Sequence, residues 1–302
     1  MNIVVIGSNG QLGWELVRRA GRRGIQVLAL DYPEIDIGNP ASVGSGIGSM
    51  EIDLIINAAA YTAVDRAESE PEAAFAVNRE GPANLAKRCQ NRSIPLIHVS
   101  TDYVFDGTKK GAYLEEDPVA PLGIYGESKA AGEAEVRNRL REHIIVRTAW
   151  LCGVHGHNFA KTILKMGREK ESLRVVSDQC GCPTFAADLA DAILEMARQT
   201  ENRVSVPWGT YHYCGKGVTT WHAFAEAIFK IAGRHEEFAV KEILPISTAE
   251  YPTPVKRPVN SVLDCTKIER YFGIQPRSWR ESLAEMIERL YKLNIIKTGR
   301  KE

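Results

Sequence analysis

The stretch Ile3-Val4-Val5-Ile6-Gly7-Ser8-Asn9-Gly10-Gln11-Leu12-Gly13 decides the fold that this sequence predicts. An apolar run typical of a buried strand leads into three glycines spaced Gly-x-x-Gly-x-x-Gly, and the segment from Trp14 onward reads as a helix. Glycines here let the backbone turn sharply and approach a pyrophosphate without a Cβ clash, while the helix N-terminus offers free N–H groups. Because the motif lies between a strand and a helix, it predicts dinucleotide binding through Gly7, Asn9, Gly10, Gln11, Leu12 and Gly13.

A second predicted strand, residues 25–30, ends at Asp31. An acid about 20 residues past the glycines can accept hydrogen bonds from the adenosine ribose hydroxyls and would repel a 2′-phosphate. This favours NADH over NADPH, although the arginines at positions 18, 19, 22 and 23 could compensate, and Asp31 could equally be a turn residue or a helix cap. Asp36 and Ile37 lie in the following loop, where such folds often contact the adenine.

The first half of the chain continues to alternate strands and helices. Strands are predicted at 53–57, 95–99 and 144–148, and helices at 71–92 and 125–141. This alternation predicts an α/β fold with a Rossmann-type doubly wound parallel sheet. We expect residues 1–150 to form the NAD(P)-binding domain. Residues 151–302 are expected to form mainly a smaller α/β substrate-binding lobe, with part of the later chain returning to the sheet.

The second half has a looser pattern. Its predicted helices are 155–170, 185–198, 219–232 and 278–293, and its predicted strands are 210–214 and 241–246. The charged tail from Lys297 to Glu302 is expected to fray.

Small and polar residues follow the predicted strands of the first half. They are Ala58, Ala59, Ala60 and Tyr61 after the third strand, and Ser100 and Thr101 after the fourth. Ligands of doubly wound sheets bind at the carboxyl ends of the strands, so we expect Ala58, Ala59, Ala60, Tyr61 and Ser100 to contact the cofactor. Thr101 and Thr148, which also end strands, are expected at the same edge. His98 lies inside the apolar fourth strand and is more typical of a packed core residue.

Tyr125 and Lys129 are four residues apart on a predicted helix, which places the phenol and the ammonium on one face. A neighbouring positive charge favours the phenolate, so we expect the pKa of Tyr125 to fall below its usual value of about 10. Such a phenol can exchange a proton with a sugar or alcohol oxygen. The spacing is common by chance and also fits a surface pair, but the upstream motifs favour the catalytic interpretation.

Composition excludes several classes of partner. The chain has 302 residues with 38 Lys+Arg and 38 Asp+Glu, so no global basic field attracts nucleic acid or anionic lipid. No apolar run approaches the roughly 20 residues of a membrane span, and we expect no signal peptide. The six cysteines are scattered without zinc spacing, which predicts free thiols in a reducing cytoplasm.

At this point the sequence resembles a known family. The stretch Gly7-Ser-Asn-Gly-Gln-Leu-Gly-Trp14-Glu15-Leu is similar to the start of an extended short-chain dehydrogenase/reductase. Four stretches resemble the dTDP-4-dehydrorhamnose reductases within that superfamily: Asn57-Ala-Ala-Ala-Tyr-Thr-Ala-Val-Asp65, Ser100-Thr-Asp-Tyr-Val-Phe-Asp-Gly107, Asp178-Gln-Cys-Gly-Cys-Pro-Thr184 and Arg257-Pro-Val-Asn-Ser-Val-Leu-Asp264. The resemblance covers nearly the whole chain.

The resemblance implies an NAD(P)H-dependent reduction of the 4-keto group of a dTDP-6-deoxy-hexulose, which gives dTDP-L-rhamnose. Tyr125 is similar to the catalytic acid, Lys129 to its partner, and Thr101 to the hydroxyl that completes the triad. Tyr125 and Lys129 would also contact the cofactor. The positions implied for the sugar nucleotide are Val64, Asp65, Thr101, Asp102, Tyr103, Tyr125, Trp150, Asn158 and Arg257. Trp150 would stack on the sugar or the thymine, unless it is a core aromatic, and Arg257 would neutralise a phosphate, unless it forms a surface ion pair.

One departure concerns metal. Some members of the family bind magnesium at a dimer interface through glutamates, and Glu15 matches one such position. Ala187 stands where those members carry a second glutamate, so we expect no structural metal, and the chain could be a monomer or a homodimer.

Other functions on the same fold stay open. A nucleotide-sugar epimerase or another 4-ketoreductase would share the glycines, Tyr125 and Lys129. A dehydratase would need a second carboxylate where Tyr103 follows Asp102. A non-catalytic regulatory subunit would not need Thr101, Tyr125 and Lys129.

Overall fold

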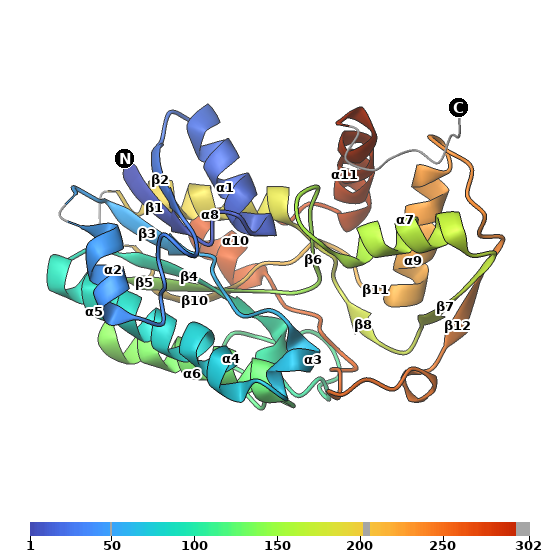
Figure 1. Ribbon diagram of the computed structural model, residues 1–302, viewed down its shortest axis with the longest axis horizontal. Coiled ribbons are helices and arrows are strands. Elements are labelled where there is room, and N and C mark those ends of the chain that lie inside the picture. The colour runs from blue at the N-terminus through green and yellow to red at the C-terminus, as the bar shows by residue number, and fades with distance from the viewer. Residues whose placement is uncertain (49, 202–205, 294–302) are drawn as a thin grey trace.

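A six-stranded, entirely parallel sheet forms the centre of the fold (Figure 1). The computed structural model describes residues 1–48, 50–201 and 206–293, so the tail expected to fray lies outside the described residues. The strands are β1 (Asn2–Ile6), β2 (Gln26–Leu30), β3 (Leu54–Asn57), β4 (Leu96–Thr101), β5 (His143–Thr148) and β10 (Gly209–His212), in the order β10-β5-β4-β3-β1-β2. The doubly wound parallel sheet predicted from the sequence is confirmed.

Helices cover both faces of the sheet, which explains why its central strands are apolar on both sides. On one face lie α1 (Gln11–Arg22), α8 (Ala186–Gln199) and α10 (Thr266–Phe272). On the other lie α2 (Pro40–Ile47), α5 (Gly81–Arg92) and α6 (Ile124–Arg139). Successive residues of β1 therefore enter different cores, with Ile3 and Val5 on one face and Val4 and Ile6 on the other. The strand order reverses between β1 and β3, the type of place where such sheets bind ligands.

A second group of elements lies beside the sheet and has its own hydrophobic core (Figure 1). It contains α7 (Phe159–Glu169), α9 (Trp221–Ala232), α11 (Trp279–Lys292) and the parallel pair β7 (Ser172–Val176) and β12 (Glu242–Ile246). Two short strand pairs join it to the sheet side: β6 (Leu151–Cys152) with β9 (Thr184–Phe185), and β8 (Cys180–Gly181) with β11 (Thr219–Thr220). The later chain also returns to the sheet, because α8, β10 and α10 pack there.

The helix predicted over 71–92 is divided into α4 (Pro71–Phe75), a π-helical turn (Ala76–Glu80) and α5. Pro82 lacks the N–H that would bond the carbonyl four residues earlier, and the Gly81 N–H instead bonds the Ala76 carbonyl, five residues back. The helix predicted from 155 begins at Phe159, because the Asn158 side chain caps its N-terminus by accepting from the Lys161 N–H. The short elements α3 (Val64–Ala67) and a 3₁₀ turn (Asp102–Val104) lie near the ends of β3 and β4.

Candidate active site

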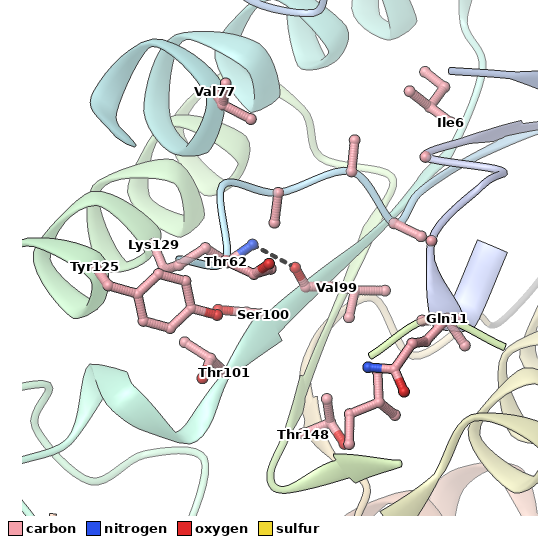
Figure 2. A pocket seen from close by; sticks show the side chains of 18 of the residues that line it. Ile6, Gln11, Thr62, Val77, Val99, Ser100, Thr101, Tyr125, Lys129 and Thr148 are labelled. Atoms are coloured by element: carbon pink, nitrogen blue, oxygen red, sulfur yellow. Dashed lines mark hydrogen bonds between the residues drawn. The ribbon is translucent and has the colours of Figure 1, made fainter. Parts of the chain in front are cut away.

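A cavity of about 700 Å³ opens at the carboxyl edge of the sheet (Figure 2). Its walls come from the ends of β1 to β5, the first turn of α1 and one face of α6. Most of the residues singled out from the sequence line it: Gly7, Gly10, Gln11, Leu12, Asp31, Asp36, Ile37, Ala58, Ala59, Ala60, Val64, Ser100, Thr101, Asp102, Tyr103, Tyr125, Lys129 and Trp150. Six others lie outside the described lining and support it: Asn9, Gly13, Tyr61, Asp65, Asn158 and Arg257.

The glycines let the turn after β1 pack directly against the residues after β3 and against α1, where a Cβ would clash with backbone atoms. Gly7 has a φ of +81°, and a Cβ there would lie 2.5 Å from the Ala59 nitrogen. A Cβ on Gly13 would lie 2.0 Å from the Gly7 carbonyl oxygen. Within the described chain no side chain caps the N-terminus of α1, so its first N–H groups face the cavity beside Gly10. The cradle fits the diphosphate of a dinucleotide.

Asp31 lies at the end of β2 and lines the same cavity. Its carboxylate accepts hydrogen bonds from the backbone N–H groups of Asn9 (2.7 Å) and Tyr32 (2.8 Å), which fixes its position. Three of the four arginines that could compensate for the Asp31 charge form ion pairs with other carboxylates. Arg18 and Arg19 pair with Glu15, and Arg19 and Arg23 pair with Asp191.

Tyr125 and Lys129 lie one helical turn apart on α6, and both are buried. Figure 2 shows the phenol of Tyr125 pointing toward the end of β4, which carries Ser100 and Thr101. The ammonium of Lys129 donates a hydrogen bond to the Val99 carbonyl at 2.7 Å (Figure 2). The strand thus fixes the position of the lysine charge beside the phenol.

The pKa expected for Tyr125 was wrong in direction. Burial raises the pKa of the phenol above its ordinary value, and hydrogen bonding by Thr101 only partly opposes this rise. Burial also lowers the pKa of Lys129 to about 8, against the opposing charge of Glu133. The cost of removing each group from water exceeds the effect of their neighbours.

Thr101 and Asp102 are hydrogen-bonded to each other at the C-terminal end of β4. The Thr101 hydroxyl donates to Asp102 Oδ1 (3.1 Å) and accepts from the Tyr103 N–H (3.2 Å). Among the described residues, Asp102 Oδ2 is buried without a hydrogen-bond partner. Burial raises the pKa of Asp102 to about 6, although Ser261 and Thr101 oppose the rise.

Three residues predicted to bind the sugar nucleotide, Asp65, Tyr103 and Arg257, contact one another next to Tyr125. Arg257 forms an ion pair with Asp65 (2.7 Å) and donates to the Tyr103 hydroxyl (3.1 Å). The Tyr103 ring meets Tyr125 edge-on at 5.4 Å between centroids. Arg257 therefore connects the loop after β12 to the wall beside the phenol.

Trp150 lines the cavity but already has an aromatic partner. Its ring stacks on Trp221, with 3.4 Å between centroids and 9° between planes, so one face is covered. The backbone of Trp150 has a φ of +49°, which is rare for a bulky residue. Gly181 permits this placement, because a Cβ there would lie 2.4 Å from the indole.

Asn158 and Tyr61 do not line the cavity, but their hydrogen bonds position segments that do. Asn158 donates to Gln11 Oε1 (3.0 Å) and to the Gly153 carbonyl (2.7 Å), so it joins α7 to the first turn of α1. Tyr61 donates its hydroxyl to Glu70 (2.6 Å), and the side-chain amide of Asn78 binds the Tyr61 backbone by accepting from its N–H and donating to its carbonyl. Asn78 lies in the π-helical turn, so this irregularity positions the loop after β3.

Several lining residues were not predicted from the sequence, among them Tyr32, Ile35, Thr62, Val77 and His157. Thr148, expected at a strand end, lines the cavity at the end of β5, at the same edge as Thr101. Trp221 carried no usable signal, because its partner Trp150 is 71 residues away in the sequence.

The position that matched a magnesium ligand is occupied by an ion-pair network. Glu15 is buried and pairs with Arg18, Arg19 and Arg289, the last at 2.9 Å. Burial would raise the pKa of Glu15, but these arginines outweigh it and lower the pKa. Among the described residues no group of three or more His, Cys, Asp or Glu side chains could hold a metal ion. The residues at this place do not fit a divalent cation.

The fold, the glycine cradle and the Thr-Tyr-Lys site together define an NAD(P)-dependent oxidoreductase of the extended short-chain dehydrogenase/reductase class. The sequence model of the family described as "RmlD substrate binding domain" matches residues 1–292. A dTDP-4-dehydrorhamnose reductase from Sinorhizobium fredii is 42% identical over 290 residues, which are 95% of this chain and 97% of that protein. The chain belongs to the dTDP-4-dehydrorhamnose reductase family.

Solved structures agree with this assignment. A dTDP-4-dehydrorhamnose reductase from Clostridium acetobutylicum superposes with a TM-score of 0.90 at 38% identity, covering 96% of this chain and all of the other. One from Bacillus anthracis, in complex with NADP, has a TM-score of 0.88 at 35% identity and covers 95% of this chain and 99% of that one.

Proposed function

We propose that this protein reduces the 4-keto group of dTDP-4-dehydro-6-deoxy-L-mannose to give dTDP-L-rhamnose. The observation that carries the proposal is the convergence of Thr101, Tyr125 and Lys129 on one cavity with the glycine cradle of α1. The similarity to dTDP-4-dehydrorhamnose reductases over nearly the whole chain supports the choice of substrate.

NADPH or NADH, when bound, supplies the hydride for the keto carbon. Gly7, Gly10 and the first turn of α1 would hold the diphosphate, and Asp31 would hold the adenosine ribose. The anchored ammonium of Lys129 would hold the second ribose. The small side chains of Ala58, Ala59 and Ala60 leave room for the cofactor to cross β3.

Tyr125 donates its phenolic proton to the developing alkoxide at C4. The phenolate that remains is stabilised by the Lys129 charge and by a hydrogen bond from Thr101. The Tyr103 N–H and Asp102 fix the Thr101 oxygen, so its single proton can turn from Asp102 to the keto oxygen and, once Tyr125 has given up its proton, to the phenolate.

The sugar nucleotide would bind on the side of the cavity that faces the second group of elements. The sugar or the thymine would stack on the face of the Trp150 ring that Trp221 does not cover, or would displace Trp221 from Trp150. Arg257 can turn from Asp65 to a phosphate, since Asp65 is exposed enough for water to take the place of the arginine. In this proposal residues 1–150 bind the dinucleotide and residues 151–302 mainly bind the substrate.

The remaining parts of the proposal concern the setting of the enzyme. It works as a monomer or homodimer in the cytoplasm, and its six free cysteines fit a reducing compartment. No helix of the described chain is long and apolar enough to cross a membrane.

The test prepares the keto-sugar from dTDP-glucose with a dehydratase and an epimerase, then adds this protein with NADPH or NADH. We expect the absorbance of the reduced cofactor at 340 nm to fall as it is oxidised. The product should co-migrate with dTDP-L-rhamnose. Cofactor consumption with a different C4 epimer would identify a sister 4-ketoreductase. No consumption of either cofactor would contradict the reductase function.

A further inference from the structure

Asp102 is a buried carboxyl group that the proposed reaction leaves without a chemical task. It lines the cavity and is 3% exposed. Its Oδ1 accepts from the Thr101 hydroxyl, while its Oδ2 has no hydrogen-bond partner among the described residues. An ionised carboxylate buried with one oxygen unpaired is costly, so this position favours a carboxylic acid that can hold a proton.

Thr101 lies on the same cavity wall as Asp102 and Tyr125, and the phenol points toward the end of β4 that carries Thr101 (Figure 2). The Thr101 hydroxyl contacts Asp102 on one side, and on the other its hydrogen bonding opposes the rise in the pKa of Tyr125. The Tyr103 N–H holds the Thr101 oxygen from a third direction. Because the threonine oxygen is fixed and its proton is not, the hydroxyl can accept a proton from one neighbour and donate its own to the other.

We propose that Asp102 is the proton reservoir that recharges Tyr125 through the Thr101 hydroxyl. As the phenolic proton bonds to the C4 oxygen, the Thr101 proton moves to the phenolate and the Asp102 proton moves to Thr101. One O–H bond forms on the product and one is lost at Asp102, which then takes a proton from water. When Asp102 is ionised, Thr101 donates to its Oδ1 at 3.1 Å, which is the arrangement after this discharge.

The surroundings of Asp102 suit this cycle. The pKa of about 6 is held up by burial, so a small further loss of water when the substrate binds would keep the acid protonated near neutral pH. The titratable groups that its charge affects are Tyr103 on its own turn, Tyr125 on α6 and Cys182 between β8 and β9. These three groups are neutral when protonated, so none of them supplies a positive charge that would hold Asp102 ionised.

The inference rests on the proposed reduction, and its test uses Asp102→Asn, which keeps the shape and the oxygen acceptor but carries no exchangeable acid. The matched control is Asp188→Asn, because Asp188 is also buried, accepts from a hydroxyl (Ser282) and has a pKa raised by burial, yet lies away from the cavity. Thermal melting checks that both variants fold. A carboxyl ¹³C NMR titration of the free enzyme should show a resonance with a midpoint near 6 that Asp102→Asn lacks.

Turnover is then measured from pH 5 to pH 9. In the wild type and in Asp188→Asn, kcat should fall about tenfold per pH unit above the pKa of Asp102, and more steeply above about 8, where Lys129 loses its charge. Asp102→Asn should lower kcat at least tenfold at its maximum and keep only the fall near pH 8. A proton inventory in D₂O should be curved for the wild type and linear for Asp102→Asn.

The outcomes separate two failures. If the wild type does not consume cofactor with the keto-sugar, the proposed function is wrong. If the wild type turns over but Asp102→Asn lowers kcat equally at every pH, with an unchanged profile and inventory, Asp102 only shapes the site and the relay is wrong. If Thr101→Val and Asp102→Asn act additively, the carboxyl does not work through Thr101, which also overturns the relay.

Discussion

Replacing Arg147 by Met should destabilise the protein by about 3 kcal/mol, because it leaves a buried carboxylate without its main partner. Glu133 is fully buried on α6, one turn beyond Lys129, and Arg147 on β5 binds it through two hydrogen bonds of 2.8 and 2.7 Å. Burial alone would raise the pKa of Glu133, but Arg147 outweighs it and lowers the pKa.

The magnitude follows from what remains after the change. Removing one partner of a buried pair typically costs about 3–5 kcal/mol. Arg137, partly exposed, still donates to Glu133 at 3.0 Å, so the lower end of this range applies. A loss of about 3 kcal/mol is a large fraction of the roughly 5–15 kcal/mol that stabilises a typical domain.

Urea unfolding followed by fluorescence measures this loss. The control is Arg139→Met, which removes an exposed pair with Glu135 on the same helix and should cost no more than about 0.5 kcal/mol. Adding Glu133→Gln to Arg147→Met should recover part of the stability, because it removes the unpaired charge. If Arg147→Met stays within 1 kcal/mol of the wild type, or if the second change recovers nothing, the buried-charge reasoning is refuted.

The dependence on pH provides a second check on the sign. The pKa of Glu133 is lower in the folded protein than in the unfolded chain, so its contribution to stability is present above the unfolded value and is lost as the pH falls through the folded value. In Arg147→Met burial should dominate, so Glu133 would take up a proton on acidification. The gap in stability between wild type and variant should therefore narrow below about pH 5.

Three further predictions concern the site. Tyr125→Phe should reduce kcat by about 10²- to 10⁴-fold while dinucleotide affinity, measured by fluorescence titration, changes little; near-normal turnover would disprove the proton-donor role. Asp31→Asn should raise kcat/KM for NADPH relative to NADH by about tenfold, because it removes a charge that repels a 2′-phosphate; an unchanged ratio would show that Asp31 does not face that ribose. Dialysis against EDTA should leave activity unchanged, because Arg289 already neutralises Glu15; loss of activity restored by Mg²⁺ would contradict this.

The parts of the fold that the sequence predicted well are encoded locally. The apolar runs of β1, β3 and β4 and the glycine turn at Gly7 depend on neighbours within a few residues, and the structure places each strand within two residues of its expected bounds. The strand β7 and the helix α10 were missed. Their burial comes from distant partners, since β7 pairs with β12 about 70 residues later and α10 packs on β10 and α8.

The site divides in the same way. The residues that line the cavity follow from strand ends, which a parallel sheet must bring to one edge. The pairing of Arg257 with Asp65, 192 residues apart, and the stacking of Trp150 on Trp221 depend on how the second group of elements sits over the sheet. The predicted direction of the Tyr125 pKa shift was wrong for a related reason. The Tyr-x-x-x-Lys spacing indicates the neighbouring charge but not how deeply the phenol is buried.

Burial of Tyr125 and Lys129 favours carbonyl reduction over the reverse reaction, alcohol oxidation. It raises the pKa of Tyr125 and lowers that of Lys129, since both changes favour the uncharged form. A phenol with a raised pKa stays protonated throughout the neutral range, so it can give a proton to an alkoxide but is seldom available to take one. Lys129 remains mostly charged below about pH 8 and stabilises the phenolate only once the proton has left. The buried pair is therefore suited to carbonyl reduction at neutral pH, whereas alcohol oxidation would require the phenolate that burial disfavours.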